Sequence, residues 1–296
     1  MDIKAYLNEK RDLVDSYLRI YFSDPSKPFL LHESVTYSLF AGGKRVRPIL
    51  ALASYEACGG DPVNILPQAC ALELIHTYSL IHDDLPAMDN DSLRRGKPTN
   101  HKVFGEAMAI LAGDALLTEA FSMISSIQTL DGGIKDSSIL EVVRRVSFAS
   151  GVHGMVGGQG QDMLSENSIP DAETLEFIHL RKTAALIKAS VIIGPVLAGS
   201  ERSILDALSS YGEYIGLVFQ IVDDILDVEG TTAQLGKTAG ADSKSRKLTY
   251  PAVYGLEKAR QKAEDLVSKA IHCLRPFSSD ADPLREIALY LLRRRA

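Results

Sequence analysis

The sequence has no tryptophan, only three cysteines, and no unbroken hydrophobic run long enough to span a bilayer. Cys58, Cys70 and Cys273 lie far apart and form no CxxC pair, which excludes a disulfide framework and a cysteine zinc site. The N-terminal segment is charged throughout, unlike a signal peptide. We therefore expect a cytoplasmic protein in a reducing compartment, without stable membrane insertion.

The sequence also lacks an excess of basic residues over acidic ones. The chain carries 32 Lys and Arg against 38 Asp and Glu, which gives a net charge of −6. A general nucleic-acid binder needs a basic face, so this charge balance argues against nucleic acid as a partner. With 46% hydrophobic and 24% charged residues, the composition is that of a globular protein.

Alternating patterns rich in β-branched residues are absent, and apolar residues recur instead at helical spacings of three and four. These spacings predict helices over 2–22, 33–57, 64–82, 102–128, 138–156, 172–199, 202–228, 248–274 and 282–295. Glycine and proline separate them, and the segment GGQGQD at 157–162 interrupts the helical pattern. No linker or repeat divides the chain. We predict an all-α protein of about ten helices in a single domain, 1–296.

Aspartates gather at the ends of two predicted helices. DDLPAMD contains Asp83, Asp84 and Asp89, and DDILD contains Asp223, Asp224 and Asp227. Two carboxylates about 4 Å apart repel by about 4 kcal/mol at an effective dielectric of 20. No basic residue follows at the i+4 position, so we expect positive charge from outside the chain. Carboxylates on a helix face suit Mg²⁺, which binds one or two of them together with substrate phosphates. The alternative is a solvated acidic cap.

Basic residues lie close to these clusters in the sequence. GGKRVRP contains Lys44 and Arg47, and its glycines allow close backbone approach. His76 lies two turns before the first acid cluster, and Arg94 and Arg95 follow that cluster. Guanidinium groups match phosphate oxygens in bidentate geometry, and lysine acts as a point charge. These residues predict a phosphate site, although each alone could be ordinary surface charge.

Other polar residues occur in apolar surroundings. Lys182 and Thr183 open the run TAALIKAS, and Gln220 lies one turn before the second acid cluster. Lys237 and Lys247 follow that cluster in the segment LGKTAGADSKSRKLTYP.

Together these motifs resemble the trans-isoprenyl diphosphate synthases, and most of all the bacterial farnesyl diphosphate synthases. The resemblance runs from GGKRVRP through HTYSLIHDDLPAMDNDSLRRGKPTNH, GGQGQD, HLRKTAALI and GLVFQIVDDILD to KLTYP. It implies a homodimer of all-α subunits, each with helices around a central cavity. It also implies that the acid clusters face each other across the mouth of this cavity. There, with three Mg²⁺, they would bind the diphosphate of an allylic substrate.

The resemblance further assigns roles to individual residues. The metal ligands would be Asp83, Asp84, Asp89, Asp223 and Asp227, with Asp83, Asp89 and Asp223 the leading ones. Lys44, Arg47, His76 and Arg95 match the isopentenyl diphosphate site. Arg94, Lys182, Lys237 and Lys247 match contacts to the allylic diphosphate, and Thr183 and Gln220 match groups near the reacting carbons. The implied catalytic residues are Lys182, Thr183 and Gln220.

The implied activity is condensation of isopentenyl diphosphate with dimethylallyl and geranyl diphosphates to give farnesyl diphosphate (C15). Helical geometry places Ser79 one turn below Asp83, and Tyr78 about 140° around the helix. The resemblance nevertheless selects Tyr78 as the residue that limits chain length. If Tyr78 is only a core aromatic, geranylgeranyl diphosphate (C20) is the alternative product.

Interpretations that place the sequence in other classes of protein remain. Glu73–His76 and Glu176–His179 are both Glu-x-x-His, the motif of a di-iron carboxylate bundle, but iron would leave the aspartate clusters and tandem arginines unexplained. A non-catalytic regulatory subunit would not need two intact acid clusters. A class I terpene cyclase would normally carry an Asn/Ser/Glu triad in place of DDILD.

Overall fold

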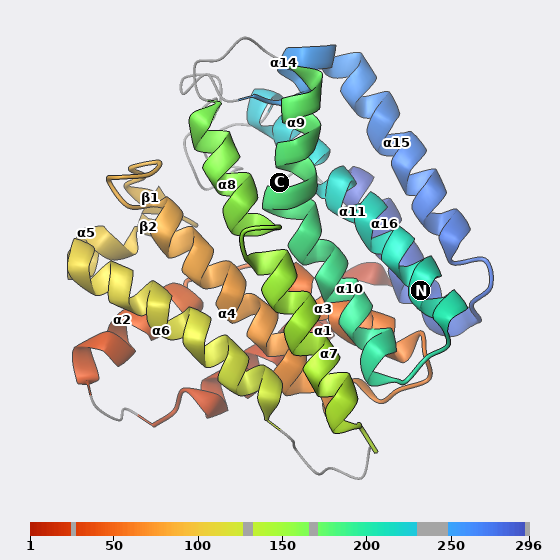
Figure 1. Cartoon of the computed structure of the whole chain (residues 1–296), viewed down its shortest axis with the longest axis horizontal. Coiled ribbons are helices and arrows are strands. Elements are labelled where there is room, and N and C mark those ends of the chain that lie inside the picture. Colours follow the sequence, from red (N-terminus) through yellow and green to blue (C-terminus); the bar gives the residue numbers. More distant parts are fainter. Residues whose placement is uncertain (25–27, 127–132, 166–170, 230–247, 294–296) are drawn as a thin grey trace.

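The computed structural model describes residues 1–24, 28–126, 133–165, 171–229 and 248–293 (Figure 1). The first half contains α1 (Ile3–Tyr21), α2 (Phe29–Leu39), α3 (Val46–Glu56), η1 (Pro62–Ile65), α4 (Leu66–Asp83), β1 (Leu93–Arg94), β2 (Lys97–Pro98), α5 (Asn100–Phe104) and α6 (Glu106–Ser125). The second half contains α7 (Asp136–Ser150), α8 (Met155–Leu164), α9 (Ala172–Ile178), η2 (His179–Ala184), α10 (Ala185–Leu197), α11 (Arg202–Glu229), α14 (Tyr250–Tyr254), α15 (Leu256–Cys273), η3 (Ser279–Ala281) and α16 (Asp282–Arg293). The predicted all-α class is confirmed.

Glycines divide several helices that the sequence pattern predicts as continuous. The stretch 33–57 forms α2 and α3, and Gly42 and Gly43 between them have φ of 102° and 136°. Gly105 separates α5 from α6, and Gly255 separates α14 from α15, both at φ 84°. Side chains disfavour positive φ, so each break occurs where glycine permits it. Hydrophobic periodicity continues across such breaks and does not reveal them.

The glycine-rich segment GGQGQD is helical, which corrects the expected interruption at 157–162. These residues belong to α8, which packs against η2. A Cβ on Gly158 would overlap the backbone nitrogen of Lys182, whereas a Cβ on Gly160 would meet nothing within 4 Å. Glycine at 158 therefore allows two helical backbones to touch, an interaction that outweighs its low helix propensity.

Within the described ranges, the sheet consists of one short hairpin. β1 pairs with β2 in antiparallel register, with Leu93 opposite Pro98 and Arg94 opposite Lys97. Arg95 lies in the turn at φ 55°. The hairpin follows the end of α4, so it places both tandem arginines next to the first acid cluster.

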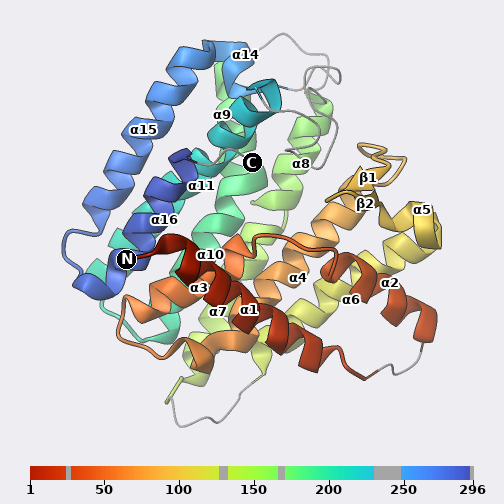
Figure 2. The same ribbon diagram turned by 180° about the vertical axis from the view of Figure 1, so that it is seen from behind.

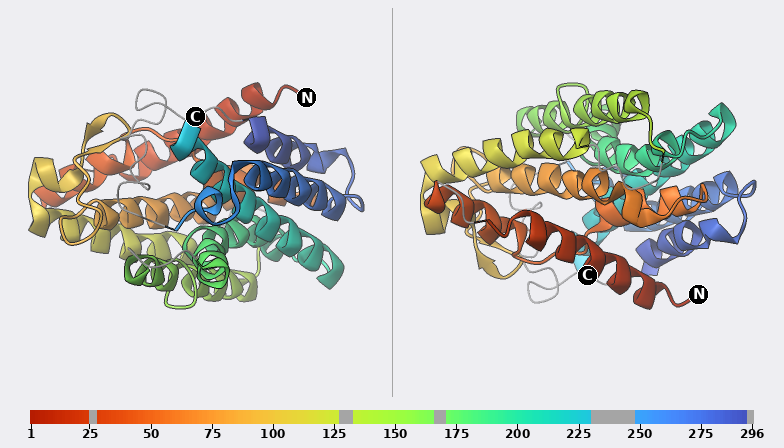
Figure 3. Two further views of the ribbon diagram at one scale, coloured as in Figure 1. Left: turned by 90° about the horizontal axis from the view of Figure 1, so that it is seen from above. Right: turned by 90° about the horizontal axis from the view of Figure 1, so that it is seen from below.

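Helix α4 runs through the middle of the molecule, between α1 on one side and α6 on the other (Figure 3). Seen from behind, α1 crosses the face that α3 and α4 present (Figure 2). Leu72, Leu74 and Ile75 of α4 are fully buried, as expected for a helix that is apolar on most of its faces. Burial on several sides fixes the position of the polar end of α4 at Asp83.

Helix α6 is the one helix in the described ranges with the length and apolar composition of a membrane span. In its most apolar window 39% of the residues are buried, and α6 packs along α4.

We predict that Gly158→Ala destabilises the protein by at least about 2 kcal/mol, because the new methyl group overlaps backbone rather than a movable side chain. Gly160→Ala, on the same helix but in open space, is the matched control. It is expected to stabilise the protein by about 0.5–1 kcal/mol through helix propensity. Urea denaturation measures both effects. Equal stability of the two variants would contradict the close-contact role of Gly158.

Candidate active site

A cavity of about 740 Å³ opens between α4, the β1–β2 hairpin, α8, η2 and α11. Its size falls within the range of small-molecule sites. Many of the residues selected from the sequence line it, although they come from distant segments of the chain. They are Arg47, His76, Tyr78, Ser79, Asp83, Arg94, Arg95, Lys182, Thr183, Gln220 and Asp223. Acidic, basic and apolar groups therefore meet around one space.

The first acid cluster divides between two environments. Asp83 ends α4 and lines the cavity, and its carbonyl oxygen accepts a 2.9 Å hydrogen bond from the amide of Asp89. Asp84 is buried and binds the guanidinium of Arg94 at 2.5 and 3.0 Å. Burial raises the pKa of Asp84 to about 6, although Arg94 acts in the opposite direction. The expectation that charge compensation comes only from outside the chain is therefore wrong for Asp84.

The second acid cluster divides in the same way. Asp223 lines the cavity, whereas Asp224 and Asp227 are buried and are not part of its lining. Asp224 accepts hydrogen bonds from the side-chain amide of Gln220 at 2.8 Å and from the backbone amide of Tyr250 at 2.7 Å. Each cluster thus presents one aspartate to the cavity and turns a neighbouring one inward.

A group of basic side chains lines the same cavity as the aspartates. Arg47 is buried, and burial lowers its pKa to about 10 even though Glu73 and Asp223 oppose that shift. Among the described residues, its Nε atom finds no hydrogen-bond partner. Buried polar groups are normally satisfied, so this nitrogen indicates a place for an anionic ligand.

His76 and Arg95 extend this basic surface. Burial, followed by the charges of Arg47 and Arg95, holds the pKa of His76 well below its usual value, so the ring is neutral near pH 7. The Arg95 guanidinium donates to the carbonyl oxygen of Gly42, and a Cβ on Gly43 would lie 2.7 Å from it. The glycines of GGKRVRP therefore admit Arg95 beside the loop.

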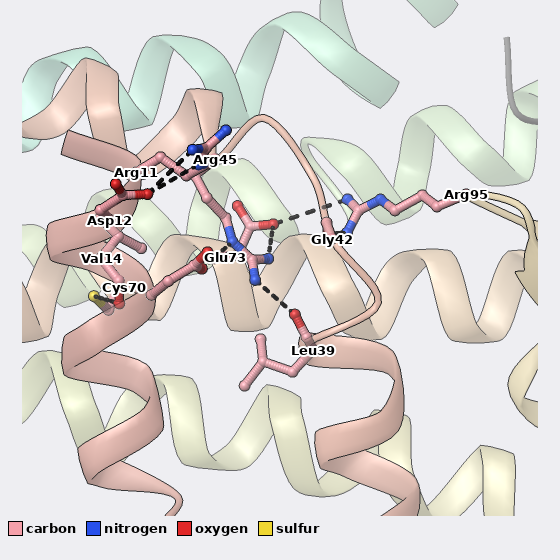
Figure 4. Close-up of polar contacts among 10 residues, drawn as sticks. Arg11, Asp12, Val14, Leu39, Gly42, Arg45, Cys70, Glu73 and Arg95 are labelled. Atoms are coloured by element: carbon pink, nitrogen blue, oxygen red, sulfur yellow. Dashed lines mark hydrogen bonds and ion pairs between the residues drawn. The ribbon is translucent and has the colours of Figure 1, made fainter. Parts of the chain in front are cut away.

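Arg45 in the same motif has a structural role that the sequence analysis missed. It is buried, at φ 49°, and donates to Asp15 at 2.8 Å, Glu73 at 2.9 Å and the carbonyl oxygen of Leu39 at 2.7 Å (Figure 4). Glu73 also lies 4.0 Å from the guanidinium of Arg95. Arg45 therefore joins α1, α2 and α4 at the point where α3 begins.

Another part of the cavity lining comes from a π-helix. η2 spans His179–Ala184 and contains Lys182 and Thr183, and π-helical turns are frequent at functional sites. The Lys182 ammonium binds Asp162 of α8 at 2.6 Å, and the Thr183 hydroxyl donates to Gln220 at 2.5 Å. The wider turn places both side chains on the cavity.

Both residues considered for chain length line the cavity. Tyr78 is 6% exposed and contacts the ring of His82 edge to face, with centroids 5.8 Å apart. The hydroxyl of Ser79 donates to the carbonyl oxygen of His76 at 2.9 Å. Tyr78 therefore supplies an apolar wall, whereas the polar atom of Ser79 bonds to its own helix.

Some residues selected from the sequence lie elsewhere. Lys44 is exposed and is not part of the cavity lining. Lys237 and Lys247 lie outside the described residues. Gln159 belongs to the GGQGQD segment, to which the sequence assigned no site role. It lines the cavity, and neither polar atom of its amide has a partner in the described parts of the chain.

The donor set fits Mg²⁺ better than a metal held by protein alone. In the described ranges, no three His, Cys, Asp or Glu side chains are close enough to hold an ion themselves. Mg²⁺ needs only one or two carboxylates when substrate phosphates complete its shell, and Asp83 and Asp223 border one cavity. The di-iron interpretation is not supported, because Glu73 binds Arg45 and His179 contacts Asp224 at 3.3 Å.

An all-helical protein with acidic and basic groups around one cavity is a framework for binding diphosphates. The Polyprenyl synthetase family model matches residues 28–286, and the chain belongs to this family of prenyl transferases.

Proteins similar to the chain include geranylgeranyl pyrophosphate synthase 11 of Arabidopsis thaliana, which is chloroplastic. It is 48% identical over 98% of this chain and 82% of its own length. The geranylgeranyl diphosphate synthase of Cyanophora paradoxa is 46% identical over 99% and 97%. The crystal structure of an FPP/GFPP synthase from Zymomonas mobilis covers 98% of this chain and 99% of its own, with a TM-score of 0.86 and 38% identity.

We predict different consequences for the two adjacent aspartates of α4. Asp83→Asn lowers prenyl-transfer turnover roughly a hundred-fold or more and raises the Mg²⁺ concentration for half-maximal activity, because a ligand on the cavity is lost. Asp84→Asn lowers stability by about 1–3 kcal/mol, because Arg94 loses a charged acceptor. Mg²⁺ titrations and thermal denaturation separate the two effects. Similar Mg²⁺ dependence in both variants would contradict the division of roles.

Proposed function

We propose that the protein condenses isopentenyl diphosphate with allylic diphosphates and depends on Mg²⁺, with three ions in each active site. The observation that carries this proposal is the single cavity bordered by Asp83, Asp223, Arg47 and Lys182. When bound, Mg²⁺ neutralises charge on the departing diphosphate. In this proposal Asp83 and Asp223 hold the metal, with Asp89 beside them, and the whole chain 1–296 acts as one polyprenyl synthetase domain.

The basic residues divide between two substrates in this proposal. Arg47, His76 and Arg95 lie together and bind isopentenyl diphosphate, with Lys44 at the edge of that site. A neutral His76 donates one hydrogen bond without adding charge beside two guanidinium groups.

In this proposal Lys182 and Arg94, which also line the cavity, contact the allylic diphosphate. As its C–O bond breaks, the bonding electrons leave with the diphosphate and an allylic cation remains. Thr183 and Gln220 present neutral dipoles to this cation, which stabilise it without capturing it. The double bond of isopentenyl diphosphate then attacks, and a proton leaves to the released diphosphate. The apolar wall that includes Tyr78 excludes water from the cation.

For product length we propose C20, geranylgeranyl diphosphate. Support comes from the Arabidopsis and Cyanophora proteins, both named geranylgeranyl synthases at 46–48% identity along nearly the whole chain. The second candidate is C15, farnesyl diphosphate, because the aromatic ring of Tyr78 lines the cavity five residues before Asp83. The Zymomonas FPP/GFPP synthase has the same fold. For location, the cytoplasm remains our proposal, and the three free thiols fit a reducing compartment.

We also propose a homodimer, with the second copy covering a face formed by α6 and α7. Leu111 of α6 and Leu140 and Phe148 of α7 are 51%, 69% and 59% exposed, and the two helices pack side by side. Exposed apolar groups gathered on neighbouring helices favour burial in an interface.

We predict that the wild-type protein, supplied with isopentenyl and dimethylallyl diphosphates and Mg²⁺, makes mainly C20 product. Tyr78→Ala removes an apolar wall, so we expect its products to be at least one five-carbon unit longer than those of the wild type. Tyr55→Ala, which truncates a buried aromatic outside the cavity lining, is the control and keeps the wild-type length. Chromatography of the dephosphorylated products measures chain length. A wild type that stops at C15 would establish the second candidate instead.

For the dimer, we predict a mass in sedimentation equilibrium of about 64 kDa, twice the 32.2 kDa chain. Leu140→Glu weakens this dimer, because a carboxylate replaces an apolar contact. Ile20→Glu, an equally exposed site on α1, leaves the mass unchanged. A wild-type mass of 32 kDa at micromolar concentration would refute the proposed interface.

A further inference from the structure

Three side chains form a hydrogen-bonded chain that begins on the cavity and ends in the protein interior. The hydroxyl Oγ1 of Thr183 donates to Oε1 of Gln220 at 2.5 Å, and Nε2 of Gln220 donates to Oδ1 of Asp224 at 2.8 Å. Thr183 and Gln220 line the cavity, whereas Asp224 is 2% exposed and does not. Among the described residues, the hydrogen bonds that connect Asp224, the middle aspartate of DDILD, to the cavity run through Gln220.

The contacts around Asp224 fix its carboxylate from three elements. Its Oδ2 accepts the backbone N–H of Tyr250 at 2.7 Å at the start of α14, and Nε2 of His179 in η2 lies 3.3 Å away. Gln220, on the same helix α11, occupies Oδ1. The carboxylate is therefore held as an acceptor by two hydrogen-bond donors, with the His179 ring in contact beside them.

The chemistry of a carboxylate then determines which group donates in both hydrogen bonds, the one between Gln220 and Asp224 and the one between Thr183 and Gln220. A carboxylate has no proton to donate, so only the NH₂ end of the Gln220 amide can face Asp224. The carbonyl end must then face Thr183, and it can only accept. The hydroxyl hydrogen of Thr183 is committed to that bond, which leaves only oxygen lone pairs of Thr183 to face the cavity.

We propose that Asp224 is a positioning residue that acts through Gln220 to keep the lone pairs of Thr183 directed at the reacting carbons. This inference rests on the proposed prenyl transfer and adds a role for a residue outside the cavity. Fixed lone pairs stabilise an allylic cation as it forms, without the cost of reorienting a dipole during the reaction. The hydrogen-bonded series from Thr183 through Gln220 to Asp224, which we call the relay, gives up no proton and accepts none. The proton lost after condensation therefore still leaves with the diphosphate.

Asp224→Asn tests this role. Asparagine can donate as well as accept, so the Gln220 amide is no longer held in one orientation and the Thr183 hydroxyl is free to turn. We expect kcat to fall roughly ten- to a hundred-fold, with the KM values of both diphosphates and the half-saturating Mg²⁺ concentration within about two-fold of wild type. Asp206→Asn, an exposed position on the same helix, is the control and keeps wild-type kcat.

A double variant shows whether Asp224 acts through Gln220. In a Gln220→Met background, Asp224→Asn has no further effect on kcat if the relay is correct. Fully additive losses, a raised Mg²⁺ requirement, or a wild-type kcat in Asp224→Asn would each overturn the inference.

If Asp224→Asn does not fold, judged by circular dichroism, Thr183→Val and Gln220→Met carry the test instead. Their losses in kcat must then be strongly coupled, and independent losses would overturn the relay. An inactive wild-type protein would refute the proposed function itself, an outcome distinct from active wild type with an unaffected Asp224→Asn variant.

Discussion

The buried guanidinium of Arg45 is the interaction on which the geometry of the basic site depends. It binds carboxylates on α1 and α4 and a carbonyl oxygen at the end of α2. Burial alone would lower its pKa, but Glu73 and Asp15 more than offset that effect and raise it. Because α3 begins directly after Arg45, this network determines where Arg47 enters the cavity. Glu73 also lies beside Arg95, so one buried carboxylate sets the spacing between Arg45 and Arg95.

Ion pairs inside the protein neutralise some of the remaining charged residues, and other charged residues stay on the cavity lining. Arg94 engages Asp84, and Lys182 engages Asp162. An isolated buried charge is costly, so each of these partners stabilises a group that the fold encloses. Asp83 and Asp223 remain on the lining, together with Arg47. The result is a cavity with negative charge at the end of α4 and within the last two turns of α11, and with positive charge on the same lining, which suits metal-bridged diphosphates.

The sequence predicts those parts of the molecule that depend on local patterns. Helical periodicity predicts the all-α class, and many of the residues chosen from the sequence do line one cavity. The family resemblance made Asp83 and Asp223 leading ligands, but the residue pattern did not predict that Asp84 turns inward, because Arg94 reaches Asp84 through the fold of a hairpin. The helix at Gly158 and the π-helical turn at Lys182 were also missed, because the backbones of these two segments pack directly against each other and a local sequence pattern does not show that contact.

The apolar wall that Tyr78 contributes to the cavity is likewise a product of packing rather than of one residue. Tyr78 lies five residues before Asp83, which is about 7.5 Å along the helix axis. Its ring rests against His82, whose Nε2 donates to the carbonyl oxygen of Ile110 at 3.1 Å. A Cβ on Gly113 of α6 would overlap that imidazole. The position of the Tyr78 ring therefore depends on the close approach of α4 and α6, and the local motif around Asp83 cannot determine that position by itself.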